Sequence, residues 1–129
     1  MKKDIKFPQI ENVFVSVVKD SEGWKVYLLN RHDKQLDTVM VTSKGYGKKD
    51  GTEQKTSVLR HMIPQIEPGE YALIEPIAEE VFHLNNEYWV SFYIAGQLYD
   101  KKYIFVPETI IKDNLSFIPE LKLEGVLHQ

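Results

Sequence analysis

The segment EYWVSFYIAGQLYDKKYIFV, residues 87–106, decides the fold class of this chain. Every second residue from Tyr88 to Ile94 is large and apolar, and side chains on a β-strand alternate between its two faces. Residues 98–106 continue after Ala95-Gly96-Gln97, a three-residue connection of the kind that forms a bulged turn. The segment therefore predicts a β-hairpin with one buried face.

Apolar stretches of strand length recur along most of the chain, while almost no stretch has the period of an amphipathic helix. We expect strands over residues 12–19, 24–30, 36–43, 55–63, 71–77, 87–94 and 98–106. Residues 55–63 are ambiguous, because Leu59, Met62 and Ile63 would also form a helical stripe. The β-branched residues of this segment favour a strand, and Pro64 should end either element.

Glycine and proline mark the connections between these strands. Asp20-Ser21-Glu22-Gly23 and Glu67-Pro68-Gly69-Glu70 predict tight turns, and residues 44–51, with three glycines, predict a long loop. Residues 78–86 predict an irregular or one-turn helical bridge, and residues 107–112 predict a short helix that starts at proline.

One all-β domain over residues 1–129 accounts for this pattern, with at most short helical turns. Its core covers roughly residues 12–106, after a polar lead over residues 1–11. The C-terminal tail, residues 107–129, is more apolar than a free tail needs to be, so it should pack on a sheet or add an edge strand. We expect an antiparallel, immunoglobulin-like sandwich.

Composition restricts the function classes. The net charge of −3 argues against a nucleic-acid module held by bulk electrostatics. The absence of cysteine excludes a disulfide scaffold, thiol catalysis and cysteine-ligated zinc. No apolar stretch approaches the length of a membrane-spanning helix, and Met1–Lys6 lacks an apolar signal segment, so we expect a cytoplasmic protein without a membrane partner.

Three segments resemble the strand pattern of immunoglobulin-like and fibronectin type III-like sandwiches: WKVYLLN at residues 24–30, DTVMV at residues 37–41 and IEPGEY at residues 66–71. The resemblance extends over about half of the chain, and the three segments themselves comprise 18 of its 129 residues. The resemblance implies a two-sheet architecture, without the Cys…Trp…Cys pattern of antibody domains.

The chain is also similar to a small bacterial protein family of about this length, some of whose members are described as a phenylalanyl-tRNA synthetase subunit. VTSKGYG at residues 41–47, KTSVLRH at residues 55–61 and NNEYWVSFY at residues 85–93 carry this similarity. It implies a link to translation. No catalytic residue follows from it, because a class II synthetase core needs a longer chain with its own arginine motifs.

The glycine-rich segment is the first candidate site. Glycine-rich loops can hold phosphate with backbone N–H groups, but neither a dinucleotide fingerprint nor a phosphate-loop Gly-Lys-Ser/Thr occurs here. The segment is therefore either a structural loop or an anion and nucleic-acid contact. Its aromatic residue among cations favours the second interpretation, since single strands are bound by stacking beside positive charges. The residues of this hypothesis are Lys44, Tyr46, Lys48 and Lys49.

The aromatic residues of the last hairpin are the second candidate site. With a three-residue connection, one face of the hairpin would carry Trp89, Tyr93, Tyr99, Tyr103 and Phe105. Such a face is covered by the C-terminal tail, serves as a homodimer or partner surface, or lines a small-ligand groove. Clusters of exposed Trp and Tyr are typical of interface hot spots.

Catalytic and metal-binding patterns are weak. Glu80 and His83 match a Glu-x-x-His ligand pair, but that site needs four helices. Ser57 and His61 would be too far apart on a strand to act together. We therefore assign no catalytic, cofactor-binding or metal-ligating residue, and we expect no cofactor.

These observations favour a non-catalytic protein-interaction module that self-associates as a homodimer through residues 87–106 or binds another protein. The alternative is an accessory protein that binds RNA or tRNA through residues 44–49. An enzyme without a recognisable motif ranks third.

Overall fold

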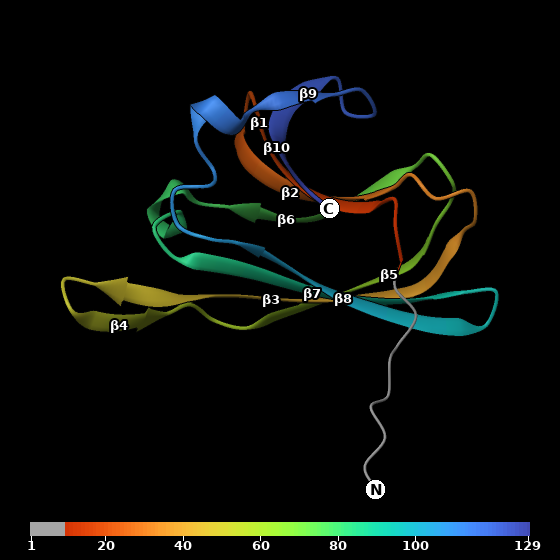
Figure 1. The fold of residues 1–129 in the computed structure, drawn as a ribbon, viewed down its shortest axis with the longest axis horizontal. Coiled ribbons are helices and arrows are strands. Elements are labelled where there is room, and N and C mark those ends of the chain that lie inside the picture. Colours follow the sequence, from red (N-terminus) through yellow and green to blue (C-terminus); the bar gives the residue numbers. More distant parts are fainter. Residues whose placement is uncertain (1–9) are drawn as a thin grey trace, which may run out of the picture.

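The computed structural model describes residues 10–129 as two antiparallel β-sheets packed face to face (Figure 1). Within this range the chain forms strands and two short 3-10 helices and no α-helix. In chain order the elements are β1 (Val13–Asp20), β2 (Gly23–Asn30), β3 (Leu36–Lys49), β4 (Thr52–Lys55), β5 (Leu59–Ile66), β6 (Tyr71–Ile77), η1 (Glu79–Val81), β7 (Asn85–Ile94), β8 (Gln97–Phe105), η2 (Lys112–Asn114), β9 (Ser116–Ile118) and β10 (Leu123–His128).

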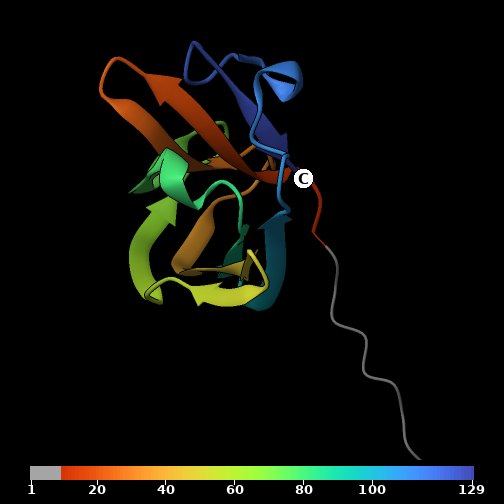
Figure 2. The same cartoon turned by 90° about the vertical axis from the view of Figure 1, so that its left-hand side faces the viewer.

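The strand order confirms the immunoglobulin-like sandwich. The first sheet has the order β6-β2-β1-β10-β9, and the second has the order β4-β3-β7-β8 with β5 also paired to β3. Strands β1, β2 and β6 take the places of A, B and E in that fold, and β3, β7 and β8 take those of C, F and G. Figure 2 shows the two layers from the side.

The interior between the sheets is built by alternating residues of both layers. Val13, Val15 and Val17 of β1 face Tyr88, Val90 and Phe92 of β7, and all six side chains are buried. Burial of such apolar side chains between the sheets supplies the main driving force for folding. The hydroxyl of Tyr103 donates a hydrogen bond to the carbonyl oxygen of Val13 at 2.6 Å, which satisfies the one polar atom of that buried ring.

A second, smaller cluster lies on the outer face of the first sheet. Its buried members are Phe14, Val18, Leu29 and Ile118. The C-terminal tail supplies the cover, because β10 pairs with β1, and β9 pairs with β10. The prediction that the tail packs on a sheet or adds a strand is therefore confirmed.

Two features hold the C-terminal tail against the first sheet. The guanidinium of Arg31 donates from Nε and Nη2 to the two carboxylate oxygens of Glu120, at 2.7 and 2.9 Å. Gly125 lets β10 approach β1 closely: a Cβ there would collide with the side chain of Val18 and lie 2.8 Å from the carbonyl oxygen of Val17.

The glycine-rich segment is not the predicted loop. β3 continues through Lys49 and turns at Asp50 and Gly51, which have φ values of 52° and 78°. Gly45 and Gly47 do not adopt positive φ. They instead leave room for neighbouring residues, since a Cβ at these positions would lie 2.9 Å from Thr56 Cγ2 and 3.2 Å from Leu84 Cδ2, respectively.

Residues 55–63 divide between the end of β4 and strand β5, which confirms the strand interpretation of this ambiguous segment. The expected end at Pro64 is wrong, because β5 continues to Ile66. Among residues 10–129, β5 pairs only with β3, and proline is tolerated on such an edge strand.

The bridge before β7 contains the one-turn helix η1, as expected. The helix predicted at residues 107–112 is wrong, since the 3-10 turn η2 begins at Lys112. Most of the predicted polar lead, residues 1–9, lies outside the described residues.

Candidate functional site

The turn of the β7–β8 hairpin decides which aromatic side chains reach the surface. Only Ala95 and Gly96 form the turn, with φ values of 48° and 81°, as in a type I′ turn. Ile94 therefore pairs with Gln97 instead of Leu98. A shift of one residue moves every side chain of one strand to the other face of its sheet.

This register corrects the predicted aromatic face. Trp89 pairs with Lys102, and Tyr93 pairs with Leu98, so these four side chains point outward. The remaining aromatic residues of the prediction point to the interior instead: Tyr103 and Phe105 are buried, and Tyr99 stacks on Phe92.

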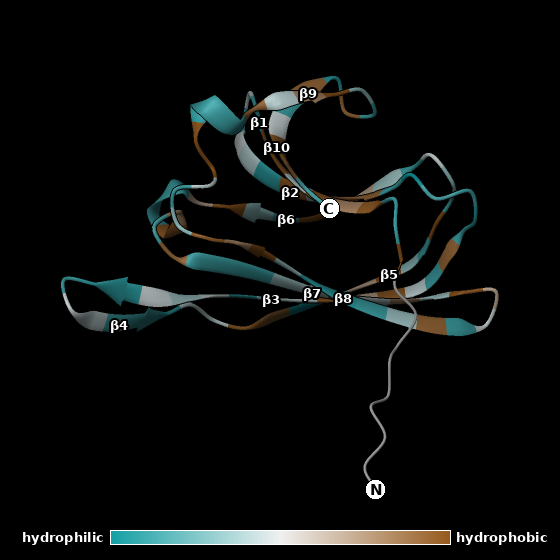
Figure 3. Ribbon diagram, viewed as in Figure 1, coloured by the Kyte–Doolittle hydropathy of each residue, from teal (hydrophilic) through white to brown (hydrophobic). Residues whose placement is uncertain are grey.

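The outer face of the second sheet, which we call the open face, carries five large exposed apolar side chains. Their exposed fractions range from 40% to 67%; the residues are Met40, Met62, Trp89, Tyr93 and Leu98. Met62 pairs with Met40, and Met40 with Ser91, so the methionines extend the patch from β7 across β3 to β5. The tail does not cover this face, because it is paired into the other sheet. Figure 3 shows apolar and polar residues interleaved along these strands.

The lysine and tyrosine residues of the first candidate site share the open face. Thr42 pairs with Trp89, and Lys44 with Glu87, so Lys44 and Tyr46 point to the same side of the sheet as Trp89. The two sites predicted separately thus form one surface.

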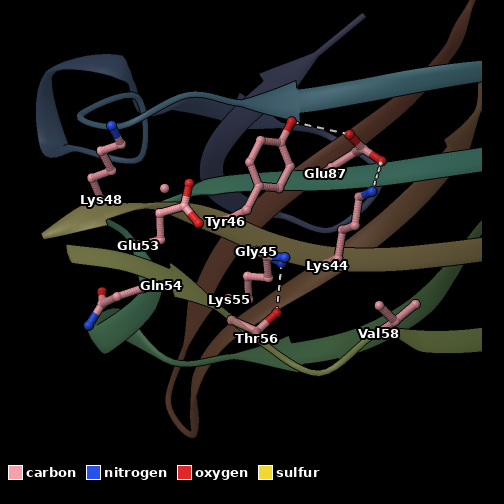
Figure 4. A pocket seen from close by; sticks show the side chains of 11 residues that line it. Lys44, Gly45, Tyr46, Lys48, Glu53, Gln54, Lys55, Thr56, Val58 and Glu87 are labelled. Atoms are coloured by element: carbon pink, nitrogen blue, oxygen red, sulfur yellow. Dashed lines mark hydrogen bonds and ion pairs between the residues drawn. The ribbon is translucent and has the colours of Figure 1, made fainter.

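At its β3–β4 end this surface is hollowed, with a volume of about 600 Å³ (Figure 4). Lys44, Tyr46 and Lys48 line the hollow together with Lys55 and Glu53. Lys49 is not among its lining residues, because it alternates to the other face of β3. Lys49 therefore does not belong with the other predicted residues.

A buried carboxylate organises the hollow. Glu87 is 6% exposed and accepts a hydrogen bond from the hydroxyl of Tyr46 at 3.2 Å, and its other oxygen lies 3.7 Å from Nζ of Lys44 (Figure 4). Burial and the neighbouring Glu87 carboxylate raise the pKa of Tyr46. Sequence reasoning missed Glu87, because nothing in its local pattern distinguishes it from an exposed strand residue.

A second carboxylate links the two sheets at their β5 and β6 edges. Oε1 of Glu75 contacts Oγ of Ser43 and Nε2 of His61, both at 2.7 Å, and Oε2 accepts a hydrogen bond from the Tyr88 hydroxyl at 3.2 Å. Ser43, Glu75 and Tyr88 also line a hollow of about 290 Å³. The carboxylate lies between serine and histidine, whereas a Ser-His-acid relay needs the imidazole in the middle. We therefore interpret this network as a structural link.

Ser57 takes no part in that network. Nε2 of His83 lies 2.6 Å from Oε1 of Gln54, and among residues 10–129 no three His, Asp or Glu side chains form a metal-binding group. No helix in the described part of the chain has the length and apolar character needed to cross a membrane.

Comparison with known proteins adds no relationship: no family model, no curated protein and no solved structure significantly matches this chain. The similarity to a bacterial family linked with translation stays a prediction. The open face must therefore be interpreted from its own chemistry.

Proposed function

We propose that this protein is a non-catalytic, cytoplasmic interaction module that binds protein surfaces through the open face. The observation that carries the proposal is the cluster of five large apolar side chains, 40–67% exposed, on one face of a sheet. Contiguous exposed apolar patches of this kind mark interaction sites, and tryptophan and tyrosine dominate interface hot spots.

The supporting scaffold suits this role. Trp89 and Tyr93 alternate along β7 with Tyr88, Val90 and Phe92, which are buried between the sheets. The exposed rings therefore project from a strand that is held firmly on its other side. Met40 and Met62 add flexible side chains that adapt to the shape of a partner.

A phage-displayed peptide library, selected on the full chain, tests the proposal. We expect selected peptides to lose binding to the double variant Met62→Ser/Trp89→Ser and to keep binding to Phe117→Ser. Phe117 is the matched control, because it is 63% exposed on β9 of the other sheet. Peptides that bind the double variant as well as the parent protein would place the contact elsewhere.

Self-association through the β7–β8 hairpin is one form of this function. Light scattering over a range of protein concentrations would detect a homodimer, and the same double variant should make it monomeric. A strict monomer at high concentration would remove the homodimer and leave binding of another protein.

Binding of single-stranded RNA is the second candidate, supported by the hollow in which Lys44, Lys48 and Lys55 surround Tyr46. Adjacent lysines on opposite faces of β3 offer a matched test by fluorescence anisotropy at low salt. If RNA uses the open face, Lys48→Ala should weaken binding and Lys49→Ala should not. Equal effects of both variants would contradict a specific contact.

A further inference from the structure

We infer that the partner of the open face is a protein segment in which large apolar side chains are flanked by carboxylates. This inference rests on the proposed function and specifies the chemistry of the partner. It follows from the cationic residues that share the open face with the apolar patch, three at its β3–β4 end and two beside Trp89: Lys44, Lys48, Lys55, Arg60 and Lys102.

The strand register places cations on both sides of the central tryptophan. Arg60 of β5 pairs with Thr42, Thr42 with Trp89, and Trp89 with Lys102 of β8. These four residues form one row across the sheet, about 14 Å long at the usual spacing of neighbouring strands. A segment anchored on Trp89 thus meets a guanidinium on one side and an ammonium on the other.

Most of these cations are free to bind a partner. Among residues 10–129, no carboxylate lies within 4.0 Å of the charged groups of Lys55, Arg60 or Lys102, whereas Lys44 contacts the buried Glu87. The face also carries the carboxylates Asp37, Glu53 and Asp100. The five cations nevertheless exceed the four carboxylates, on a chain whose net charge is −3.

The contacts of the aromatic rings favour a protein segment over a nucleic acid. Nζ of Lys102 lies 4.8 Å from the ring centroid of Trp89, and Nζ of Lys44 lies 5.7 Å from that of Tyr46. Each ammonium group lies over one of the two faces of its ring, so that only the other face is open to a base. The most exposed members of the patch, such as Met62, offer neither a ring for a base nor a charge for a phosphate.

A second copy of the chain is a poorer match than an acidic segment. In a twofold dimer the same patch meets itself, so a face with excess positive charge would oppose an identical one. Opposite charges across an interface favour encounter and set the correct orientation, and like charges oppose it. A segment with carboxylates beside apolar side chains complements both the positive charge and the apolar surface of the open face.

Fluorescence anisotropy with designed peptides tests this inference on the full chain. The probe is a short labelled peptide that alternates Glu with Leu and Phe. Matched peptides carry Lys in place of Glu, or Ser in place of Leu and Phe, and a labelled oligouridine is the nucleic-acid arm. We expect only the acidic apolar peptide to bind, with an affinity that falls as salt is added.

Two sets of variants locate the contact. Arg60→Glu and Lys102→Glu together should weaken binding by about tenfold, since reversed charges replace attraction with repulsion. Lys112→Glu, at an exposed position in η2, should not. Met62→Ser should weaken binding, and Phe117→Ser should leave it unchanged.

Three results would overturn the inference: equal binding of the basic peptide, tighter binding of oligouridine, or no binding of the acidic peptide. If Met62 is still needed for self-association or for library peptides without acidic residues, the interaction module stands and only the partner chemistry is wrong. If nothing depends on Met62 and Trp89, both proposals fail.

Discussion

The outer faces of the two sheets both carry large apolar side chains, but only on the first sheet does the C-terminal tail bury a cluster of them. Tyr71 and Leu73, at the β6 edge of that sheet, lie beyond this cover and are 43% and 49% exposed. On the first sheet, Phe14, Val18 and Leu29 pack beneath Ile118 and the β9–β10 turn. On the second sheet, Met62 and Trp89 are 67% and 45% exposed. The same kind of residue thus stabilises the fold on one face and is available for binding on the other.

The difference arises from where the chain places its last two strands. β10 adds to the free edge of β1, and the Arg31–Glu120 pair holds the preceding β9–β10 turn over the first sheet. In Figure 1, β9 lies on the side of β1 that faces away from the second sheet, whereas β10 lies beside β1 in the first sheet. Apolar residues on the outer face of a sheet therefore do not identify an interface unless no other part of the chain packs over them.

The largest effect should come from truncating the covered face. Ile118→Ala removes a fully buried side chain and should lower the free energy of unfolding by about 2–4 kcal/mol. Met62→Ala, on the open face, should change it by less than about 0.5 kcal/mol. Urea unfolding of both variants measures the contrast, and similar losses would mean that the open face is packed in solution.

Alkaline pH should lower the free energy of unfolding, because two tyrosines are buried in the interior between the sheets. Burial raises the pKa of Tyr88, with a further contribution from Glu75, and burial raises the pKa of Tyr103. Because the folded state disfavours both phenolates, stability should be complete below pH 10 and fall above it. The loss is about 1.4 kcal/mol per pH unit for each phenol.

Absorbance of tyrosinate and circular dichroism, followed together through an alkaline titration, measure this effect. The last two phenols should ionise only as the strands unfold. Ionisation of all seven tyrosines before any loss of structure would contradict the burial of these two rings.

A smaller effect is expected at the clamp on the covered face. The hydrogen bonds from Arg31 lower the pKa of Glu120, so the pair stabilises the fold above the unfolded carboxyl pKa and loses its contribution as the pH falls. Glu120→Gln should cost about 1 kcal/mol at pH 7 and less at about pH 3. Thermal unfolding at the two pH values checks this, and an equal cost at both would exclude the charge as its source.

The smallest expected effect concerns the two-residue turn that sets the register of the β7–β8 hairpin. Ala95→Asn places a residue that tolerates positive φ in the first turn position, where Ala95 has a φ of 48°. It should raise the free energy of unfolding by a few tenths to about 1 kcal/mol. Gln97→Asn, at an exposed position next to the turn, is the control. A loss of stability at position 95 would contradict the two-residue turn.

Much of the fold could be predicted because alternation along a strand is a local property. It located most strands and the sandwich, including β5, in which Met62 and Ile63 also fit a helical stripe. Gly45 and Gly47 misled the prediction, since glycine serves both flexible loops and close packing, and only the positions of Thr56 and Leu84 distinguish the two.

The candidate site was only partly predictable, because it depends on pairing between strands. Trp89, Tyr93, Lys44, Tyr46 and Lys48 were identified from their residue types, but the register that joins them was not. Asparagine before glycine usually indicates a two-residue turn, and Ala95-Gly96 lacks it. The sequence therefore predicted a three-residue connection, which shifts the strand register by one residue. The Glu75 network joins four strands and leaves no local signal.

The pairing of β1 with β10 also has a consequence for biosynthesis. Val15 lies opposite His128 in the strand register, so the earliest described strand completes its sheet only with one of the last. While the ribosome is still translating, one backbone edge of Val13–Asp20 stays without its neighbour. The nascent polypeptide must therefore delay its final folding until translation reaches that distant segment, and during this interval chaperones would have an exposed edge to protect.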